Sequence, residues 1–360
     1  MVETRYVEIP PPAGPLDLSR PHFVGICGAG MSALAHLLAG RGAQVSGSDL
    51  RMGESATALE EAGCRVRAGH DAANTVGASV VVWSSVIDAA NPEIIAARAA
   101  GVPVAHRSHV LTQLVAEADR SVVVAGTHGK STATMLLAAA VGHLHPSWVA
   151  GAAPAGSVNG RTGSGLLIAE GDESDRSVAL YRPDVAVVLN ADDDHPETFA
   201  GTGDVVATLT DFAAGARALV VCADDAGARE VANRVRGHGD VQVVTFGASA
   251  RRRRAAAVGG AGAGRQQGDR ARRRRRAGVV DGAYARSSGG ARVARRVRGG
   301  PGPGRAARGA GGGTVRFAGV RRRMEMVGER RGVRVVDSSP TTPPRSPRTS
   351  PPRASWPSGG

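Results

Sequence analysis

The chain of 360 residues carries a net charge of +13 at pH 7, and this charge is unevenly divided. Residues 1–248 hold 17 Lys and Arg against 27 Asp and Glu, whereas residues 249–360 hold 28 Arg against 5 acidic residues. The second part also contains no Leu and no Ile. Because a packed core needs such side chains, the composition excludes a conventional globular fold there, and we expect a largely disordered tail.

Three further features bear on location. The longest apolar runs fall far short of the ~20 residues that a membrane span needs. Residues 1–17 contain one Arg, several acids and a Pro cluster, which is not typical of a signal peptide. Cys27, Cys64 and Cys222 are widely spaced, which favours reduced thiols over disulfides or a zinc site. We therefore expect a soluble cytoplasmic protein with no membrane partner.

The first organised unit begins with a strand followed by a glycine turn. Residues 22–28 read as a buried strand that breaks into Gly28-Ala29-Gly30-Met31-Ser32, and Leu residues then recur at helical spacing. Such a turn lets the backbone approach a phosphate at the positive end of the helix. A second strand over 43–47 leads to Asp49, where a ribose-binding acid would stand. Because Ala33 occupies the third glycine position, a dinucleotide, another nucleotide and a plain tight turn all remain open.

The same unit continues with alternating strands and helices. Strands are predicted over 80–83 and 102–105, with a helix over 91–100 between them. Ser84 and Ser85 follow the first of these strands, at the edge where parallel sheets bind ligands. His70 lies in a polar connection, where a surface histidine is the commoner interpretation.

The second unit contains a phosphate-binding loop. A strand over 121–125 leads into Gly126-Thr127-His128-Gly129-Lys130-Ser131-Thr132 and then into an apolar helix. Backbone amides of such a loop wrap phosphates, the Lys ammonium reaches the terminal ones, and the next hydroxyl ligates Mg²⁺. The usual spacing would place a glycine at Val124, so this is a shorter variant. Lys130 is the only lysine beside 44 arginines, which strengthens the prediction.

Two acidic clusters follow later strands. A strand over 166–169 precedes Glu170-Gly171-Asp172-Glu173-Ser174-Asp175, and a strand over 185–189 precedes Asn190-Ala191-Asp192-Asp193-Asp194-His195. Acidic loops are often merely solvated turns. Because the carboxyl ends of parallel strands share one edge, we expect these clusters to converge on the magnesium of a bound nucleotide.

Together these motifs resemble the Mur ligase family, ATP-dependent enzymes that add amino acids to a UDP-sugar precursor of the bacterial cell wall. The resemblance rests on GAGMS at 28–32, GSD at 47–49, GTHGKST at 126–132, EGDESD at 170–175 and the run at 190–195. It favours the branch that joins L-alanine to UDP-N-acetylmuramate, with its tripeptide-recycling relative as the alternative.

The resemblance implies roles for particular residues. Lys130 would hold the ATP phosphates, Ser131 and Glu170 would ligate one Mg²⁺, and His195 would ligate a second. Arg323 would contact ATP, as would the other residues of the phosphate loop. Gly171 and Pro196 depart from the commoner family residues. The implied UDP-sugar contacts are Gly28, Gly30, Met31, Ser32, Asp49, His70 and Ser84.

The implied reaction is activation of a carboxylate. Lys130 and magnesium would neutralise the γ-phosphate while the lactyl carboxylate attacks it, and the amine of L-alanine would then displace phosphate from the acyl phosphate. No protein nucleophile is required, because positioning and charge stabilisation lower the barrier.

The predicted fold class is α/β, with a Rossmann-like domain followed by a phosphate-loop domain and a third domain that is not intact. The expected segments are a UDP-sugar-binding domain at 20–110, an ATP-binding domain at 120–248, an Arg/Gly-rich segment at 249–316, a remnant of the third domain at 317–337 and a Pro/Ser tail at 338–360.

The tail has two interpretations. Residues 317–337 resemble the family's entry into its third domain, after which the family reads roughly AHHPTEV. Shifting a GC-rich reading of that string by one base gives PTTPPRS, which is residues 340–346. We therefore interpret the tail as partly out of frame, with impaired activity. The alternative is a nucleic-acid-binding tail carried by Arg clusters at 251–254 and 272–276, although base-stacking aromatics are nearly absent there.

Overall fold

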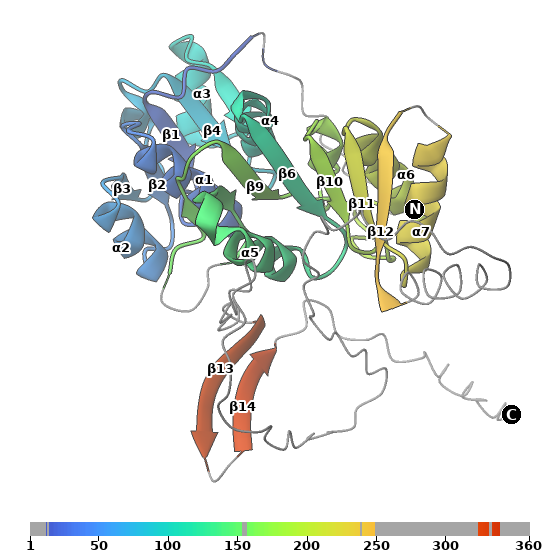
Figure 1. Cartoon of the computed structure of the whole chain (residues 1–360). Coiled ribbons are helices and arrows are strands. Elements are labelled where there is room, and N and C mark those ends of the chain that lie inside the picture. The colour runs from blue at the N-terminus through green and yellow to red at the C-terminus, as the bar shows by residue number, and fades with distance from the viewer. Residues whose placement is uncertain are drawn as a thin grey trace, which may run out of the picture. The chain divides into compact units, whose positions relative to one another are not determined.

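The computed structural model describes residue 12, residues 14–152, 157–237 and 240–248, and the backbone of 323–330 and 333–338. Its first sheet is parallel, with strand order β3-β2-β1-β4-β5 (Figure 1). The chain moves outward from β1 in one direction and then resumes at β4 on its other side, so β1 and β4 flank a switch point where such sheets bind ligands. The elements are β1 Pro21–Val24, α1 Ala29–Gly40, β2 Ser46–Asp49, α2 Glu54–Glu61, β3 Arg65–Ala68, β4 Val80–Trp83, α3 Pro92–Ala99 and β5 Val104–His106.

The second sheet has the order β12-β11-β10-β6-β9-β7-β8 and is parallel except for the β7–β8 pair. Helix α4, Arg107–Glu117, lies between the two sheets in the chain. The structure therefore confirms the α/β class with two parallel sheets. The remaining elements are β6 Arg120–Ala125, α5 Lys130–Ala140, β7 Ser147–Val149, β8 Gly160–Arg161, β9 Leu166–Glu170, β10 Val185–Val188, α6 Thr202–Ala214, β11 Ala218–Cys222, α7 Ala226–Arg236 and β12 Gln242–Phe246.

The first strand ends earlier than its apolar pattern predicts. The strand predicted over 22–28 stops at Val24, because Gly25 takes a φ of +77° and begins the turn. The N–H groups of Gly25 and Ile26 both donate to Ser48 O, so the chain folds back while the Ile26 side chain stays buried. Burial alone therefore produced an apolar pattern that resembles a longer strand.

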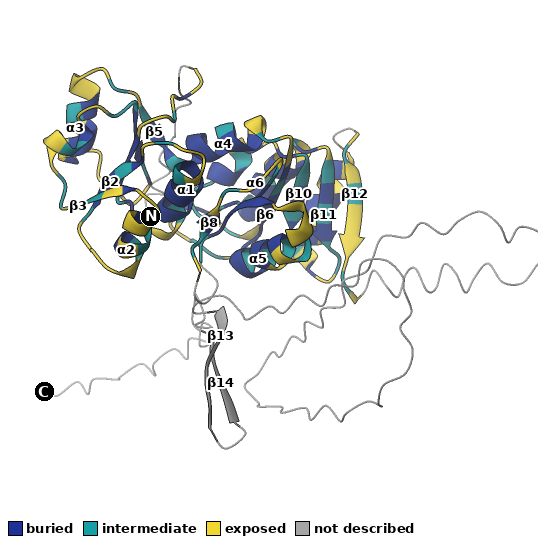
Figure 2. Ribbon diagram, turned by 60° about the vertical axis from the view of Figure 1, so that its left-hand side comes forward, coloured by how far each residue is buried: buried dark blue, intermediate teal, exposed yellow. Residues whose placement is uncertain are grey.

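Burial is concentrated along the inner strands of both sheets and along α1, as the dark blue ribbon in Figure 2 shows, whereas the edge strands β3 and β12 are mostly exposed. Helix α1 buries eight consecutive residues from Met31 to Leu38, because neighbouring elements cover it on more than one side. By contrast, α2 buries only Ala56 and Leu59.

A short segment of the second unit is docked on α1. The Asn159 side chain donates to Ala29 O at 2.6 Å and to Ser32 Oγ at 2.9 Å. Thr162 Oγ1 donates to the helix carbonyl of Leu37 at 2.7 Å. Between them, Gly160 approaches the helix so closely that an added Cβ would lie 2.0 Å from a backbone oxygen. This contact links the glycine turn to the second sheet.

Glu93 of α3 is fully buried and joins several segments of the first unit. Its carboxylate accepts from Ser48 Oγ at 2.6 Å and from Asn74 Nδ2 at 2.7 Å. The imidazoles of His22 and His70 lie 3.5 and 3.2 Å from its oxygens. Burial raises the pKa of Glu93, but the nearby His22 imidazole and hydrogen bonds from Ser48 and Asn74 outweigh it and lower the pKa to about 2.

This network predicts acid-dependent stability. Since the folded-state pKa of Glu93 lies below its ordinary 4.5, the ionised group contributes stability that is present above about pH 4.5 and lost as the pH falls toward 2. We expect Glu93→Gln to lower the free energy of unfolding at pH 7. Between about pH 4.5 and 2, the variant should lose less of that free energy than the wild type does. Urea midpoints measured by circular dichroism test this, with Glu61→Gln on exposed α2 as the control. Parallel curves for the wild type and Glu93→Gln would contradict it.

Strands β13, Arg323–Arg330, and β14, Val333–Ser338, form an antiparallel pair. The predictions for 249–316 and for the tail after Ser338 lie outside the described residues, as does the side chain of Arg323. In the part of the chain that the structure describes, no helix is both long and apolar enough to cross a membrane.

Candidate functional site

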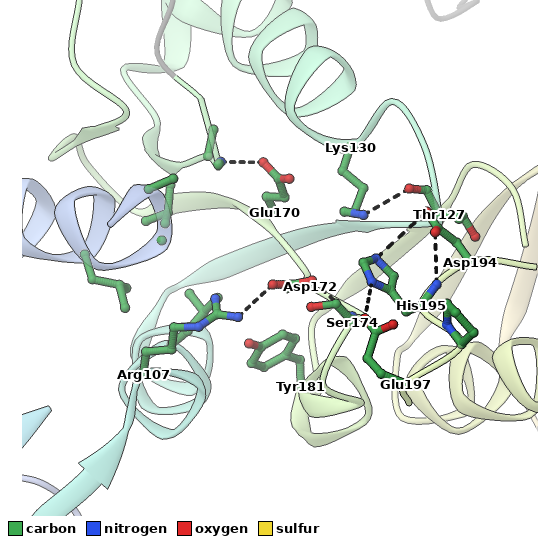
Figure 3. A pocket seen from close by; sticks show the side chains of 18 residues that line it. Arg107, Thr127, Lys130, Glu170, Asp172, Ser174, Tyr181, Asp194, His195 and Glu197 are labelled. Carbon is green, nitrogen blue, oxygen red and sulfur yellow. Dashed lines mark hydrogen bonds and ion pairs between the residues drawn. The ribbon is translucent and has the colours of Figure 1, made fainter. Parts of the chain in front are cut away.

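A pocket of about 550 Å³ gathers residues from both units (Figure 3). The first unit contributes the glycine turn through Ala29 and Gly30. The second contributes the phosphate loop and both acidic clusters, and Arg107 at the start of α4 completes the wall. Lys130, Glu170 and His195 therefore line one pocket, and their predicted convergence on a nucleotide-bound magnesium stays a prediction.

The phosphate loop is shaped by two glycines with positive φ. Gly126 has a φ of +133°, and an added Cβ would lie 3.0 Å from the backbone N and O of Asn190. Asn190 also exchanges two hydrogen bonds with the backbone of His128, at 2.8 and 3.0 Å. Gly129, with a φ of +83°, is the N-cap of α5 and supplies no capping side chain. The N–H groups of the first helical turn are thus suited to bind an anion.

The Lys130 ammonium is held beside this loop by a buried carboxylate. Its Nζ donates to Glu173 Oε1 at 2.8 Å and to Thr127 O at 3.3 Å. Glu173 is 1% exposed, and its Oε2 has no hydrogen-bond partner. Burial raises the pKa of Glu173, although Lys130 opposes this effect. The sequence placed Glu173 in the acidic cluster without singling it out, because only the fold brings it to Lys130.

Ser131 and Glu170 meet at the same end of the loop. Ser131 Oγ donates to Glu170 Oε1 at 3.0 Å, while Glu170 Oε2 accepts from the N–H of Gly151. A hydroxyl and a carboxylate are the hard oxygen donors that Mg²⁺ prefers. No cluster of three or more His, Cys, Asp or Glu suited to a metal occurs among the described residues. The pair therefore fits a cation whose coordination is completed by water and substrate phosphates.

His195 belongs to the same pocket but is oriented by its own loop. It has a φ of +55°, and its N–H donates to Asp194 Oδ1 at 2.9 Å. Its Nδ1 lies 3.2 Å from Glu197 Oε1, so that carboxylate helps set the ring's orientation. The predicted role of His195 at a second magnesium stays a prediction.

The predicted sugar-nucleotide residues divide into two groups. Gly30 lines the pocket, and Gly28 is the N-cap of α1 beside it. Met31 and Ser32 are buried, and Ser32 donates both its N–H and its Oγ–H to the carbonyl of Gly28, so contacts of these two residues with a UDP-sugar stay predictions. Asp49 supports the turn by accepting from Cys27 N at 3.0 Å.

Of the seven candidates only Gly30 lines the pocket, and the last two, His70 and Ser84, make contacts elsewhere. His70 Nδ1 faces Ser48 Oγ at 2.8 Å and belongs to the Glu93 network. Ser84 is buried, whereas its neighbour Ser85 reaches the second unit and donates to Asp175 Oδ2 at 2.9 Å. Their contacts with a UDP-sugar stay predictions.

Arg107 is the pocket residue that the sequence analysis missed. Its Nη2 donates to Asp172 Oδ2 at 2.7 Å and to Asp175 Oδ2 at 3.3 Å. Burial raises the pKa of Asp172, but Arg107 and Lys130 outweigh it and lower that pKa to about 2. Burial also raises the pKa of Tyr181, another pocket residue, so its hydroxyl stays protonated. Arg107 stands in the sequence without a motif around it, and only the fold brings it to the acidic cluster.

The fold and the pocket define an α/β protein in which a phosphate loop and a second glycine turn face each other. Residues 20–118 match the family described as "Mur ligase family, catalytic domain". The chain therefore contains a Mur ligase family domain.

Relatives of known name agree with this assignment. The chain is 46% identical over 244 residues to UDP-N-acetylmuramate–L-alanine ligase of Paenarthrobacter aurescens, and 45% identical over 247 residues to that of Streptomyces avermitilis. Each match covers 66% of this chain and 53% of the relative, so the chain spans about half the length of the curated relatives it matches.

Two solved structures share the fold. The UDP-N-acetylmuramate-alanine ligase of Thermotoga maritima is 28% identical with a TM-score of 0.55, covering 62% of this chain and 52% of that chain. A ligase of UDP-N-acetylmuramate and L-alanyl-gamma-D-glutamyl-meso-diaminopimelate from Neisseria meningitides is 26% identical with a TM-score of 0.58, covering 64% of this chain and 78% of that chain.

Proposed function

We propose that this chain binds ATP and UDP-N-acetylmuramate and belongs to an enzyme that joins L-alanine to that sugar nucleotide. The names of its curated relatives support the substrates. The strongest support from the fold is that Gly30 of the glycine turn and Lys130 of the phosphate loop line the same pocket.

ATP binds at the phosphate loop. The N–H groups at the start of α5 donate to its phosphates, and Lys130, whose ammonium Glu173 holds beside the loop, donates to the terminal ones. Ser131 and Glu170 hold Mg²⁺, which when bound stabilises the negative charge that develops on the transferring phosphoryl group. Thr127, His128 and Thr132 belong to the same loop.

UDP-N-acetylmuramate binds with its diphosphate at the glycine turn. Gly28 and Gly30 let the backbone come close, and the positive end of α1 attracts the anion. The lactyl carboxylate then reaches toward the γ-phosphate across the pocket.

The reaction is transfer of the γ-phosphoryl group to that carboxylate. A carboxylate oxygen forms the new P–O bond as the bond to ADP breaks, which gives an acyl phosphate and ADP. The amine of L-alanine attacks the acyl carbon, phosphate leaves, and the amine loses a proton as the amide forms. Residues of the chain act by positioning and charge stabilisation. The Neisseria relative is named for a peptide substrate, so a peptide amine is the alternative.

Calorimetric titration tests the two binding sites. We expect the chain to bind ATP with Mg²⁺ and, separately, UDP-N-acetylmuramate, and not to bind NADH tightly. UDP-glucose serves as a control that carries the diphosphate without the lactyl group. Tight binding of NADH without binding of UDP-N-acetylmuramate would replace this proposal with a dinucleotide enzyme.

Turnover tests the interpretation of the tail. We expect little or no phosphate release that requires both UDP-N-acetylmuramate and L-alanine, because the sequence after residue 248 departs from the family pattern. A variant gene with the reading frame restored after residue 248 should gain that activity. Robust turnover by the chain as written would contradict the frame-shift interpretation.

A further inference from the structure

Asp175 links the two units through a single carboxylate. Its Oδ1 accepts from the N–H of Ser177 at 3.0 Å, within its own loop. Its Oδ2 accepts from Ser85 Oγ at 2.9 Å and from Arg107 Nη2 at 3.3 Å, both of which precede the second sheet. Oδ1 therefore stabilises the acidic loop itself, and Oδ2 connects that loop by hydrogen bonds to the first unit.

Ser85, which makes this contact from the first unit, is oriented by the buried imidazole of His106. His106 Nδ1 lies 2.7 Å from Ser108 Oγ and 3.3 Å from Ser108 N, both of which can donate to it, and this arrangement favours a proton on Nε2. That Nε2 lies 3.0 Å from Ser85 Oγ and can donate to it. The hydroxyl proton of Ser85 is thereby directed toward Asp175, and His106 is fixed by edge-on packing against Trp83.

Arg107 extends the link to both halves of the pocket. Its Nη1 lies against the glycine turn, only 2.9 Å from where a Cβ on Gly30 would be. Its Nη2 pairs with Asp172, and the next residue, Glu173, holds the Lys130 ammonium. A close contact, two ion pairs and one peptide unit thus connect the glycine turn to the phosphate loop, and Figure 3 shows the Arg107–Asp172 pair of this path.

We propose that Arg107 and Asp175 are positioning residues that couple the binding of the sugar nucleotide to the binding of ATP. This inference rests on the proposed function. A diphosphate at the turn would contact the guanidinium directly, and the orientation of that guanidinium is set by the loop that presents Glu173 to Lys130. Either ligand therefore orders a link that the other also uses, and the second ligand loses less entropy on binding.

Asp175→Asn separates the two functions of this carboxylate. The amide keeps one oxygen for the N–H of Ser177, but its NH₂ cannot accept from Ser85 or Arg107. Arg107→Lys is a second variant that keeps the positive charge and loses the planar fork. Asp211→Asn, on an exposed position of α6, is the matched control for loss of one negative charge.

The experiment measures the affinity for UDP-N-acetylmuramate with and without a saturating non-hydrolysable ATP analogue and Mg²⁺. For the wild type we expect about a 5-fold or greater tightening, within the usual range of coupling between sites. Asp175→Asn and Arg107→Lys should reduce this ratio toward 1, while Asp211→Asn keeps it. A merely structural role would lower thermal stability and both affinities but leave the ratio unchanged.

The possible results separate a failure of the proposed coupling from a failure of the proposed function. A wild type that binds both ligands without coupling would overturn the inference and leave the proposed function intact. A wild type that binds neither would overturn both. If Asp175→Asn does not fold, Arg107→Lys decides the question, and an unchanged ratio in that variant refutes the coupling.

Discussion

Replacing Lys130 with alanine should abolish ATP binding and leave UDP-N-acetylmuramate binding nearly unchanged. Lys130 is the only lysine of the chain, and its ammonium stands at the loop that is shaped to bind phosphates. Charge-assisted hydrogen bonds contribute ~1.5–3 kcal/mol each, so loss of two of them weakens ATP binding by a factor of about 100 or more. Calorimetric titration of each ligand by itself measures both affinities.

The same substitution removes the partner of a buried carboxylate. Glu173 would be left without its ion-pair partner in a nearly dry site, and breaking a buried pair in this way costs roughly 3–5 kcal/mol. The double variant Lys130→Ala with Glu173→Gln removes that charge, so it should recover stability without recovering ATP binding. If the double variant bound ATP as the wild type does, Lys130 would have no role at the phosphates.

Local sequence patterns predicted those parts of the fold that depend on local chemistry. A strand followed by a glycine turn and an apolar helix occurs at β1–α1 and at β6–α5, as expected, because Gly25, Gly126 and Gly129 take positive φ angles that favour glycine. The end of β1 was predicted four residues too late, since the buried Ile26 continues the apolar pattern after the hydrogen bonding has stopped.

Local sequence patterns could not predict the contacts between segments that are distant in the chain. Ser84 and Ser85 are alike in sequence, and only the fold determines that Ser85 meets Asp175. Arg107 pairs with residues 65 and 68 positions away, and no local spacing marks a pair at that separation. Glu173 was visible only as one acid among several, because its pairing with Lys130 depends on how β6 and β9 lie side by side.

Gly160→Ala should loosen the docking of the second unit on α1 and weaken binding of UDP-N-acetylmuramate. An added Cβ would lie 2.0 Å from the carbonyl oxygen of Ala33 and 2.8 Å from its carbonyl carbon, and backbone atoms cannot move aside as a flexible side chain can. Either β8 or α1 must shift, and such overpacking costs ~1–3 kcal/mol. The shift would also disturb the contacts of Asn159 with Ala29 and Ser32, which lie at the positive end of α1.

Thermal unfolding and titration with UDP-N-acetylmuramate measure the two effects of Gly160→Ala together. Gly203→Ala is the matched control, because Gly203 lies in α6 with nothing within 4 Å of an added Cβ. Alanine favours a helix over glycine by ~1 kcal/mol, so the control should be neutral or slightly more stable. We expect ATP affinity to change less than sugar-nucleotide affinity, since Lys130 and Ser131 do not contact β8. Equal stability and equal sugar-nucleotide affinity in Gly160→Ala and the wild type would show that this docking does not position the glycine turn.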